Sequence, residues 1–272
     1  MATVAFLIPT RDRHAVLARS LPSVVAAARR IGAAVIICDQ SAQAFAAQSG
    51  ITVLHRPDLN GLPAARNALL HATRADLVCF LDDDTDIAPD FAEVLARLAV
   101  CEPDLAGWGP VVETRPAAIR RWHRLVHLGG FRDERRLTAR RSDHDTTALF
   151  GCCFALRRAA ALAVGGFDAR RPGYALGEDL DCCRRLVAAG FRLRFSASLR
   201  AVHRRDGADR ADTWRRGLAK GSFLVWCARR HGGPTPATPV HLALALVAAA
   251  SGRGAEPARP LAVLAAAARS LG

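Results

Sequence analysis

Residues 76–91 read DLVCFLDDDTDIAPDF, an apolar run that passes directly into a cluster of acids. The run at 76–81 is typical of a strand that is buried on both faces. The acids that follow it are Asp82, Asp83, Asp84 and Asp86. Capping of the next helix would explain one or two acids, such as Asp86 or Asp90, but not the three consecutive acids at 82–84. Because Mg²⁺ and Mn²⁺ bind carboxylates together with substrate phosphates, we expect a divalent-cation site at the end of this strand.

Similar apolar runs alternate with helical patterns through the first hundred residues. Strands are expected at 4–9, 33–39, 51–56 and 76–81, and helices at 15–32, 63–73 and 88–99. This alternation indicates a parallel sheet with helices on both faces. Ligands bind beyond the carboxyl ends of such strands, so the polar groups that begin at Thr10, Asp39 and Asp82 should meet at one edge. The sequence contains neither a GxGxxG nor a GxxxxGK[ST] phosphate loop.

The second half of the chain is less regular. We expect strands at 105–113, 149–157, 191–196 and 199–204, a helix at 178–190, and C-terminal helices at 211–230 and 238–270. The Arg- and His-rich residues 115–145 fit no regular element, and a loop over the site is one interpretation of them.

Composition restricts the class of protein and of partner. The chain has 272 residues, 51% of them hydrophobic, and a formal net charge of +13. It can therefore bury a large core, and its charge favours anionic partners, although scattered arginines that solubilise the surface explain the charge equally well. The eight cysteines include no CxxC pair, the start lacks a signal-peptide layout, and no apolar stretch reaches the length of a membrane span. These features predict a cytoplasmic protein.

Several motifs in order along the chain resemble the family 2 glycosyltransferases with the GT-A fold. FLIPTRDR and IICDQS match the ends of its first two strands, and NGLPAARNALLHATRADLVCFLDDD matches its A-R-N segment and DxD motif. The block FALRRAAALAVGGFDARRPGYALGEDLDCCRRLVAAGF contains the GGFD turn and the ED motif of the acceptor side, and VHRR follows. DxD alone is a weak signal, but the A-R-N, DxD, GGFD and ED motifs in this order are specific. The resemblance as a whole covers about residues 3–230.

The resemblance implies an α/β fold of GT-A type. Its mainly parallel central sheet would be flanked by helices, with a Rossmann-like nucleotide-sugar half at 1–114 and an acceptor half at 115–230. Residues 231–272 would form a helical C-terminal extension. These helices could dock peripherally on the inner face of an acidic membrane, but they lack a clearly basic face, so packing on the core or on another subunit is preferred.

The resemblance also assigns roles to matching positions. Asp179 would be the general base of an inverting transfer, and Asp82, Asp84 and His203 would bind Mn²⁺ or Mg²⁺. Asp39 would read the nucleotide base, with Thr10 and Arg66 beside it, and three consecutive acids leave two registers open for Asp83. The donor site would comprise Pro9, Thr10, Arg11, Asp39, Asn60, Gly61, Arg66, Asp82 and Asp83, and the acceptor side Gly166, Phe167, Asp168 and Glu178. A UDP-sugar is the donor most common in the family, and the acceptor would be a glycan, a lipid-linked glycan or a small natural product.

Other interpretations remain for the same residues. The acids of GEDLD suit the first turn of any helix, and a His at a strand end is often only hydrogen-bonded at the surface. Cysteines at 152 and 153 stand where the family often has a polar residue. A haloacid-dehalogenase-like phosphatase also carries DxD after a strand, but after its first one. A nucleotidyltransferase would need a Gly-rich loop where PTRDR stands, and a nucleic-acid-binding protein would need aromatic residues among its basic ones.

Overall fold

The computed structural model describes residues 2–46, 48–114, 142–170, 177–204 and 230–231. The chain divides into two compact units, and the first comprises residues 1–117, 134–173 and 178–207. A nine-stranded sheet forms the centre of this first unit. The domain boundaries expected after residues 114 and 230 stay predictions.

The first four strands form the parallel half of the sheet. β1 (Val4–Thr10), β2 (Ala34–Asp39), β3 (Ile51–His55) and β4 (Leu77–Leu81) lie in the order β3-β2-β1-β4, and each neighbouring pair is parallel. Along β1, Phe6 and Ile8 belong to one hydrophobic core and Ala5 and Leu7 to another. Burial on both faces explains why these strands read as continuous apolar runs. All four strands expected from the sequence are confirmed.

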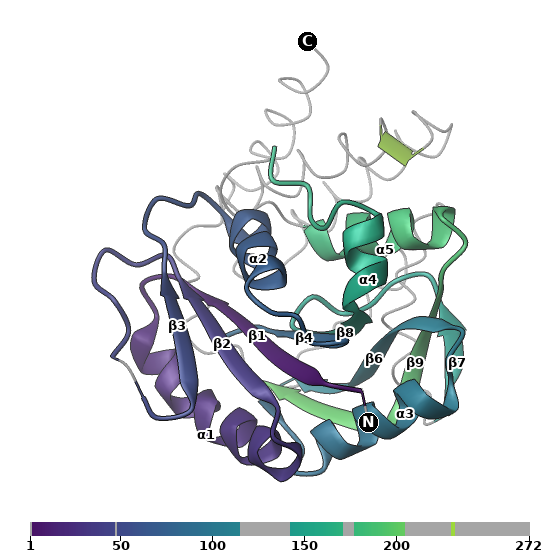
Figure 1. Cartoon of the computed structure of the whole chain (residues 1–272), viewed down its shortest axis with the longest axis horizontal. Helices are drawn as coiled ribbons and strands as arrows, with labels where there is room; N and C mark the ends of the chain where they lie inside the picture. Colours follow the sequence, from purple (N-terminus) through teal and green to yellow (C-terminus); the bar gives the residue numbers. More distant parts are fainter. Residues whose placement is uncertain (1, 47, 115–141, 171–176, 205–229, 232–272) are drawn as a thin grey trace, which may run out of the picture. The chain divides into compact units, whose positions relative to one another are not determined.

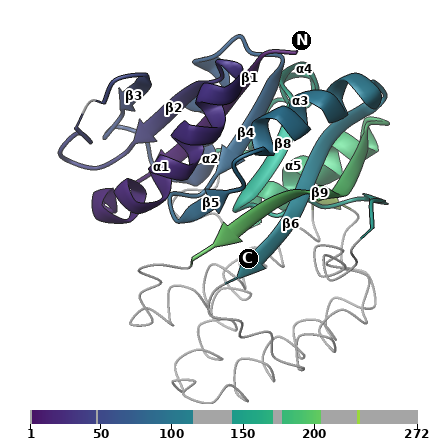
Figure 2. The same cartoon turned by 90° about the horizontal axis from the view of Figure 1, so that it is seen from below.

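Helices cover both faces of the sheet (Figure 1). α1 (His14–Ile31) and α3 (Phe91–Cys101) pack on the core that contains Phe6, and α2 (Leu62–His71), α4 (Arg158–Ala163) and α5 (Glu178–Ala188) pack on the opposite core. Figure 2 shows α1 and α3 lying across the strands on their shared face. α1 continues through Pro22 and ends at Gly32, whose φ of 65° lies in the left-handed region that glycine adopts without strain.

The other half of the sheet is mixed. β8 (Cys153–Arg157) runs antiparallel to both β4 and β6 (Leu105–Thr114), whereas β6 and β9 (Arg192–His203) are parallel. β5 (Thr85–Ile87) and β7 (His144–Thr146) each pair antiparallel with β9. The strand expected at 149–157 begins only at Cys153, because the Cys153 amide donates to the Phe150 carbonyl at 3.1 Å and closes a turn over 150–153.

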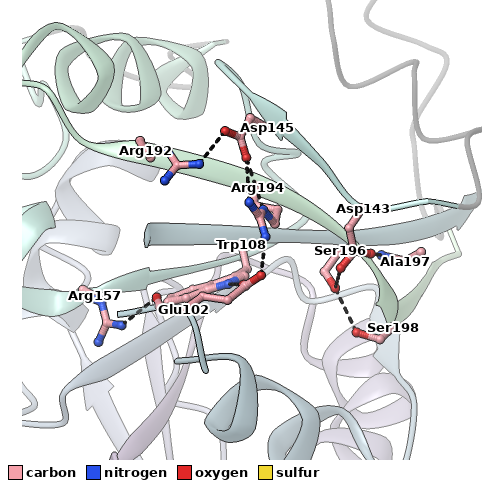
Figure 3. A network of polar contacts seen from close by, with 10 residues as sticks. All are labelled: Glu102, Trp108, Asp143, Asp145, Arg157, Arg192, Arg194, Ser196, Ala197 and Ser198. Carbon is pink, nitrogen blue, oxygen red and sulfur yellow. Dashed lines mark hydrogen bonds and ion pairs between the residues drawn. The ribbon is translucent and has the colours of Figure 1, made fainter. Parts of the chain in front are cut away.

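The short strands expected at 191–196 and 199–204 are in fact one strand, β9, interrupted by a bulge. Its pairing with β6 jumps from Pro110↔Ser196 to Val111↔Arg200, so residues 197–199 lie outside the ladder. Asp143 supports this bulge by accepting a hydrogen bond from the Ala197 amide at 2.7 Å and another from the Ser196 hydroxyl at 3.4 Å (Figure 3). Both parts of β9 therefore belong to the same sheet.

A polar network ties β7 and the end of α3 to β9 (Figure 3). Arg194 lies between Glu102 and Asp145 and pairs with both. Glu102 also accepts a hydrogen bond from the indole of the fully buried Trp108 at 2.7 Å. Arg157 lies 5.4 Å from the centre of the Trp108 ring and donates to the carbonyl groups of Ala99, Glu102 and Leu105. Arg194 is therefore paired with two acids at this end of the sheet, and Arg157 is bound to backbone carbonyls.

Three expectations from the sequence fall wholly or mainly outside the described residues. These are the loop at 115–145, of which residues 115–141 are not described, and the C-terminal helices at 211–230 and 238–270. The seven cysteines in the described part are free thiols. Within the described ranges, none of the helices combines the length and the apolar character needed to cross a membrane.

Candidate active site

The polar groups after β1, β2 and β4 meet at one edge of the sheet, as expected for parallel strands. The Thr10 hydroxyl donates to Asp83 Oδ2 at 2.8 Å, which joins the end of β1 to the acids after β4. The Asp12 amide donates to Ser41 Oγ at 2.8 Å, which joins the end of β1 to the residues after β2. Asp12 has a φ of 55°, so the chain turns sharply at this point.

Asp82, Asp84 and His203 form a cluster whose potential ligand atoms all lie within 4.8 Å of one another. His203 Nε2 is 3.0 Å from Asp84 Oδ1. The short strand β5 creates this proximity, because Thr85 pairs with His203 and the Arg204 amide donates to the Asp84 carbonyl at 3.0 Å. The cluster brings together the three residues expected from the resemblance to bind metal, and their role as ligands stays a prediction.

Asp83 points away from this cluster. Its carboxylate accepts from Thr10 and lies 3.2 Å from Arg13 Nη2, and its side chain is almost fully buried. Burial raises the pKa of Asp83 to about 6, even though Arg13 and Thr10 oppose that shift. The middle acid of the three is therefore bound to the protein itself.

Arg13 is a residue that the sequence motifs did not single out. Its Nη2 lies 2.9 Å from Asp84 Oδ2 as well as 3.2 Å from Asp83 Oδ1. Burial alone would raise the pKa of Asp84, but His203 and Arg13 outweigh burial and hold that pKa below its ordinary value. The available signal was the pair of arginines, Arg11 and Arg13, just after a strand whose end is expected to lie beside three acids. Arg13 makes part of the acidic cluster tolerable without any ion.

Two carboxylates and one imidazole are a donor set that fits Mn²⁺ or Mg²⁺. Hard oxygen ligands suit these ions, and both usually complete their coordination with water and substrate phosphates. Asp84 is buried, whereas Asp82 and His203 are partly exposed. Burial raises the pKa of Asp82, against the effect of Arg66 and His203, so this carboxylate would gain from a further cation nearby.

Asp39, expected to read the nucleotide base, is fully buried and bonded within the protein. Its carboxylate accepts hydrogen bonds from the Ser41 amide and hydroxyl and, at 2.6 Å, from the Phe45 amide. His14 Nε2 lies 2.9 Å from Asp39 Oδ2. Burial alone would raise the pKa of Asp39, but these hydrogen bonds outweigh burial and lower it. The carboxylate therefore fixes the loop after β2, and a direct contact with a base stays a prediction.

The other donor-side candidates differ in exposure. Pro9 is buried within β1, opposite Cys38 of β2. Arg11 and Asn60 are exposed, and so are available to a ligand. Gly61 precedes α2 with a φ of 101°, and its carbonyl accepts a hydrogen bond from Gln40 at 3.2 Å. The structure thus brings the residues after β2 to the start of α2.

The resemblance implied a position for Arg66 beside Asp39, but none of the contacts described for Arg66 involves Asp39. The Arg66 side chain is 1% exposed and contacts Glu178 Oε1 at 2.6 Å, Asp82 Oδ1 at 3.3 Å and the Gly151 carbonyl at 2.7 Å. Helix α2 directs Arg66 towards β4 and the start of α5, whereas Asp39 lies at the end of β2. Arg66 therefore contacts both the cluster of Asp82, Asp84 and His203 and the ED motif.

Asp179 lies in the first turn of α5 and is buried. The residue packed against its carboxylate is Gly151, where a Cβ atom would lie only 2.8 Å from Asp179 Oδ2. The neighbouring Cys152 carbonyl accepts a hydrogen bond from the Asp82 amide at 2.9 Å. The turn at 150–153 therefore contacts both Asp179 and the DxD motif, and Gly151 is a site residue that the sequence patterns missed.

The GGFD turn is held by the A-R-N segment. Asn67 accepts from the Phe167 amide and donates to the Phe167 carbonyl, both at 2.8 Å. Gly166 has a φ of 65°, its carbonyl accepts from Arg185 at 2.7 Å, and a Cβ there would lie 2.5 Å from Asn67 Oδ1. Asp168 instead pairs with the exposed Arg170. Of the acceptor-side candidates, Gly166 and Phe167 shape the turn and Glu178 pairs with Arg66.

Comparisons with known proteins support the family resemblance. The model of the family described as Glycosyltransferase like family 2 matches residues 2–217. Two curated relatives, both pre-mycofactocin glycosyltransferases from strains of Mycobacterium tuberculosis, are 30% identical over 214 residues, in an alignment that covers 74% of this chain. The alignment covers only 42% of the length of those relatives.

Solved structures of glycosyltransferases share the fold. The mannosyltransferase PcManGT from Pyrobaculum calidifontis, in complex with GDP-Man and Mn²⁺, aligns with a TM-score of 0.62 at 17% identity, over 99% of this chain and 87% of that one. GalNAc-T7 with UDP, GalNAc and Mn²⁺ aligns with a TM-score of 0.58 at 16% identity, over 84% of this chain and 50% of that one. Mannosyl-3-phosphoglycerate synthase from Rubrobacter xylanophilus gives 0.62 at 16% identity, over 86% and 77%. The GT-A-type fold expected from the sequence is confirmed, and the chain belongs to glycosyltransferase family 2.

Proposed function

We propose that this protein transfers a sugar from a nucleotide-diphosphate sugar to a hydroxyl group of an acceptor, with inversion at the anomeric carbon. The observation that carries the proposal is the joint position of two acidic groups. One is the cluster of Asp82, Asp84 and His203, and the other is Asp179. The single turn at 150–153 contacts both of them. The family assignment favours this activity over the phosphatase and nucleic-acid-binding alternatives.

Asp82, Asp84 and His203 would hold Mn²⁺ or Mg²⁺ together with the diphosphate of the donor. When bound, the ion neutralises the charge that develops on the departing nucleoside diphosphate. Two of the similar solved structures contain Mn²⁺, which supports this choice of ion. Arg13 already contacts Asp84 and is one-third exposed, so it is placed to add positive charge near the same phosphates.

Asp179 is the residue that we assign as general base. A hydroxyl group is a weak nucleophile, and a carboxylate within hydrogen-bonding reach can accept its proton as the bond to the sugar forms. Asp179 is held in the first turn of α5, and the lack of a side chain at Gly151 lets its carboxylate approach the turn at 150–153 closely. Attack from the face opposite the diphosphate would invert the anomeric centre.

The nucleotide would lie over the ends of β1 and β2. Arg11 and Asn60 are exposed there, and Asp39 fixes the loop after β2. A UDP-sugar is our first choice of donor, as the family resemblance implies, and a GDP-sugar is the second because similar structures hold each nucleotide. The acceptor would be a glycan, a lipid-linked glycan or a small natural product, and the names of the curated relatives add pre-mycofactocin to the compounds to screen.

Titration calorimetry tests the donor site directly. UDP, GDP, dTDP and CDP are each titrated into the protein with and without Mn²⁺. Tight binding of one nucleotide that requires Mn²⁺ is the expected result, because Asp82 and Asp84 would hold the ion and its charge would attract the diphosphate. The absence of binding by all four nucleotides in both conditions would contradict the proposal.

The Asp179→Asn variant tests the assignment of the base. Asparagine keeps the size of the side chain but cannot accept the proton, so transfer should be abolished while Mn²⁺-dependent nucleotide binding remains near the wild-type level. Transfer is measured as release of nucleoside diphosphate from the sugar nucleotide whose diphosphate binds. Turnover at the wild-type rate would refute the role of Asp179.

A further inference from the structure

Arg66 is a charged side chain enclosed by aromatic rings. Its guanidinium carbon lies 5.9, 5.3 and 5.5 Å from the ring centres of Phe80, Phe154 and Phe167, respectively. These phenylalanines are themselves fully or almost fully buried, and Phe80 packs against both of the others. The rings favour a cation electrostatically, but they also keep Arg66 out of water.

The polar edge of Arg66 faces the site. Nη1 binds Glu178 Oε1 at 2.6 Å, and Nη2 binds the Gly151 carbonyl at 2.7 Å and Asp82 Oδ1 at 3.3 Å. These partners come from α5, from the turn at 150–153 and from the end of β4, respectively. One planar fork therefore connects three segments that are far apart in the sequence.

Core stability alone does not account for an arginine at this position. Burying a charge is costly, and an apolar side chain of similar volume often stabilises a core equally well. The Arg66 Nε atom is also buried without a hydrogen-bond partner within the described part of the chain, which adds to the cost. The contacts with Glu178 and Asp82 offset part of this cost, and both acids border the candidate active site.

We propose that Arg66 is a positioning residue that holds the metal-binding carboxylate of Asp82 and the start of α5, with Glu178 and Asp179, in a fixed relation. This inference rests on the proposed function and deepens it. Arg66 does not touch the donor in this role, since its side chain is almost fully buried. It acts by occupying Oδ1 of Asp82 and by anchoring Glu178, the residue beside the proposed base.

The first test is the Arg66→Lys variant. A lysine keeps the charge but cannot reach Glu178, Gly151 and Asp82 at once, because it lacks the planar fork. The Mn²⁺-dependent affinity for the nucleoside diphosphate should fall by about 10- to 100-fold, as is typical when a residue that orients a metal ligand is lost. Nucleotide binding without Mn²⁺ should not change.

The matched control is Arg157→Lys. Arg157 also lies over an aromatic ring and binds backbone carbonyls, but none of the contacts described for it involves an acid of the site. This control should lower the thermal unfolding midpoint without any change in Mn²⁺-dependent binding. An equal loss of metal-dependent binding in both variants would show that Arg66 acts only through stability, and would overturn the proposal.

A second pair of variants keeps Arg66 itself and so remains informative if Arg66→Lys does not fold. Glu178→Gln weakens the anchor of Arg66, whereas Asp179→Asn makes the same change from a carboxyl group to an amide one residue further along α5. We expect Glu178→Gln to reduce Mn²⁺-dependent affinity several-fold more than Asp179→Asn. Equal effects of the two variants would indicate a general effect of losing a carboxyl group at the start of α5 and would overturn the proposal.

Binding measurements on the wild-type protein distinguish a failure of the proposed function from a failure of the proposed role of Arg66. If the wild-type protein binds no nucleoside diphosphate with Mn²⁺, the proposed function fails. If it binds but Arg66→Lys and Glu178→Gln bind equally well, the proposed function stands and only the role of Arg66 is wrong.

Discussion

Replacement of Gly151 by alanine should displace the proposed base, Asp179, while leaving the cluster of Asp82, Asp84 and His203 in place. The new Cβ atom would lie 2.8 Å from Asp179 Oδ2 and 3.1 Å from its Cγ, whereas ordinary van der Waals contact begins near 3.4 Å. The Asp179 carboxylate must therefore retreat by about 0.6 Å. Because a misplacement of about 1 Å at a reacting group can cost about 100-fold in rate, we expect a loss of about tenfold.

The rate is measured as release of nucleoside diphosphate from the sugar nucleotide identified by calorimetry. Gly109→Ala is the matched control, because its Cβ atom would meet Leu149 Cδ2 at 3.0 Å, a similar small overlap with an apolar side chain instead of an acid. Both variants should keep the wild-type affinity for the nucleoside diphosphate with Mn²⁺. Thermal unfolding of each variant shows whether the fold is retained.

Two results would refute this reasoning. A wild-type rate in folded Gly151→Ala would mean that close packing of Asp179 on the turn does not matter for transfer. A tenfold loss in Gly109→Ala as well would mean that any small overlap near the sheet slows the enzyme, without a specific effect on the base.

Three further substitutions give separate tests. Asp84→Asn should weaken Mn²⁺-dependent nucleotide binding by at least about tenfold, seen by calorimetry, and metal-free binding should stay the same. Asp39→Asn should reduce the loss of unfolding free energy that the wild-type protein shows as the pH falls. Because the pKa of Asp39 is lowered in the folded protein, its contribution to stability is present above pH ~4 and is lost as the pH falls through that pKa. Urea unfolding at a series of pH values measures this effect, and an unchanged pH dependence would refute it. Gly166→Ala should cost about 1–3 kcal/mol, because a φ of 65° and a contact of 2.5 Å with Asn67 Oδ1 both oppose a side chain, and an unaltered unfolding free energy would contradict it.

The sequence was a good guide to the parallel half of the fold. Continuous apolar runs with helices between them defined β1 to β4 to within one residue, because burial on both faces leaves a clear mark on composition. The short strand β5 was missed, since three residues within an acidic stretch carry no detectable periodicity. The bulge in β9 was mistaken for a gap between two strands, because residues 197–199 interrupt the alternation.

The site was predictable in its residue types but not in its contacts. The acids after β4 and His203 were identified from their motifs, and the structure brings them together. The positions of Arg66 and Gly151 depend on contacts between residues 66 and 178 and between 151 and 179, which no local pattern encodes. The role of Arg13 depends equally on the approach of β1 to the end of β4.

The strand order has a consequence for how the chain folds during synthesis. β4 pairs with β1 on one side and with β8 on the other, and β8 is made more than seventy residues after β4. Until residues 153–157 leave the ribosome, the edge of a partly formed sheet is β4, an apolar strand with unpaired amide and carbonyl groups. The three consecutive acids at the end of that strand would repel a second copy of the same edge, so Asp82 and Asp84 would limit aggregation of the nascent chain before they bind metal in the finished protein.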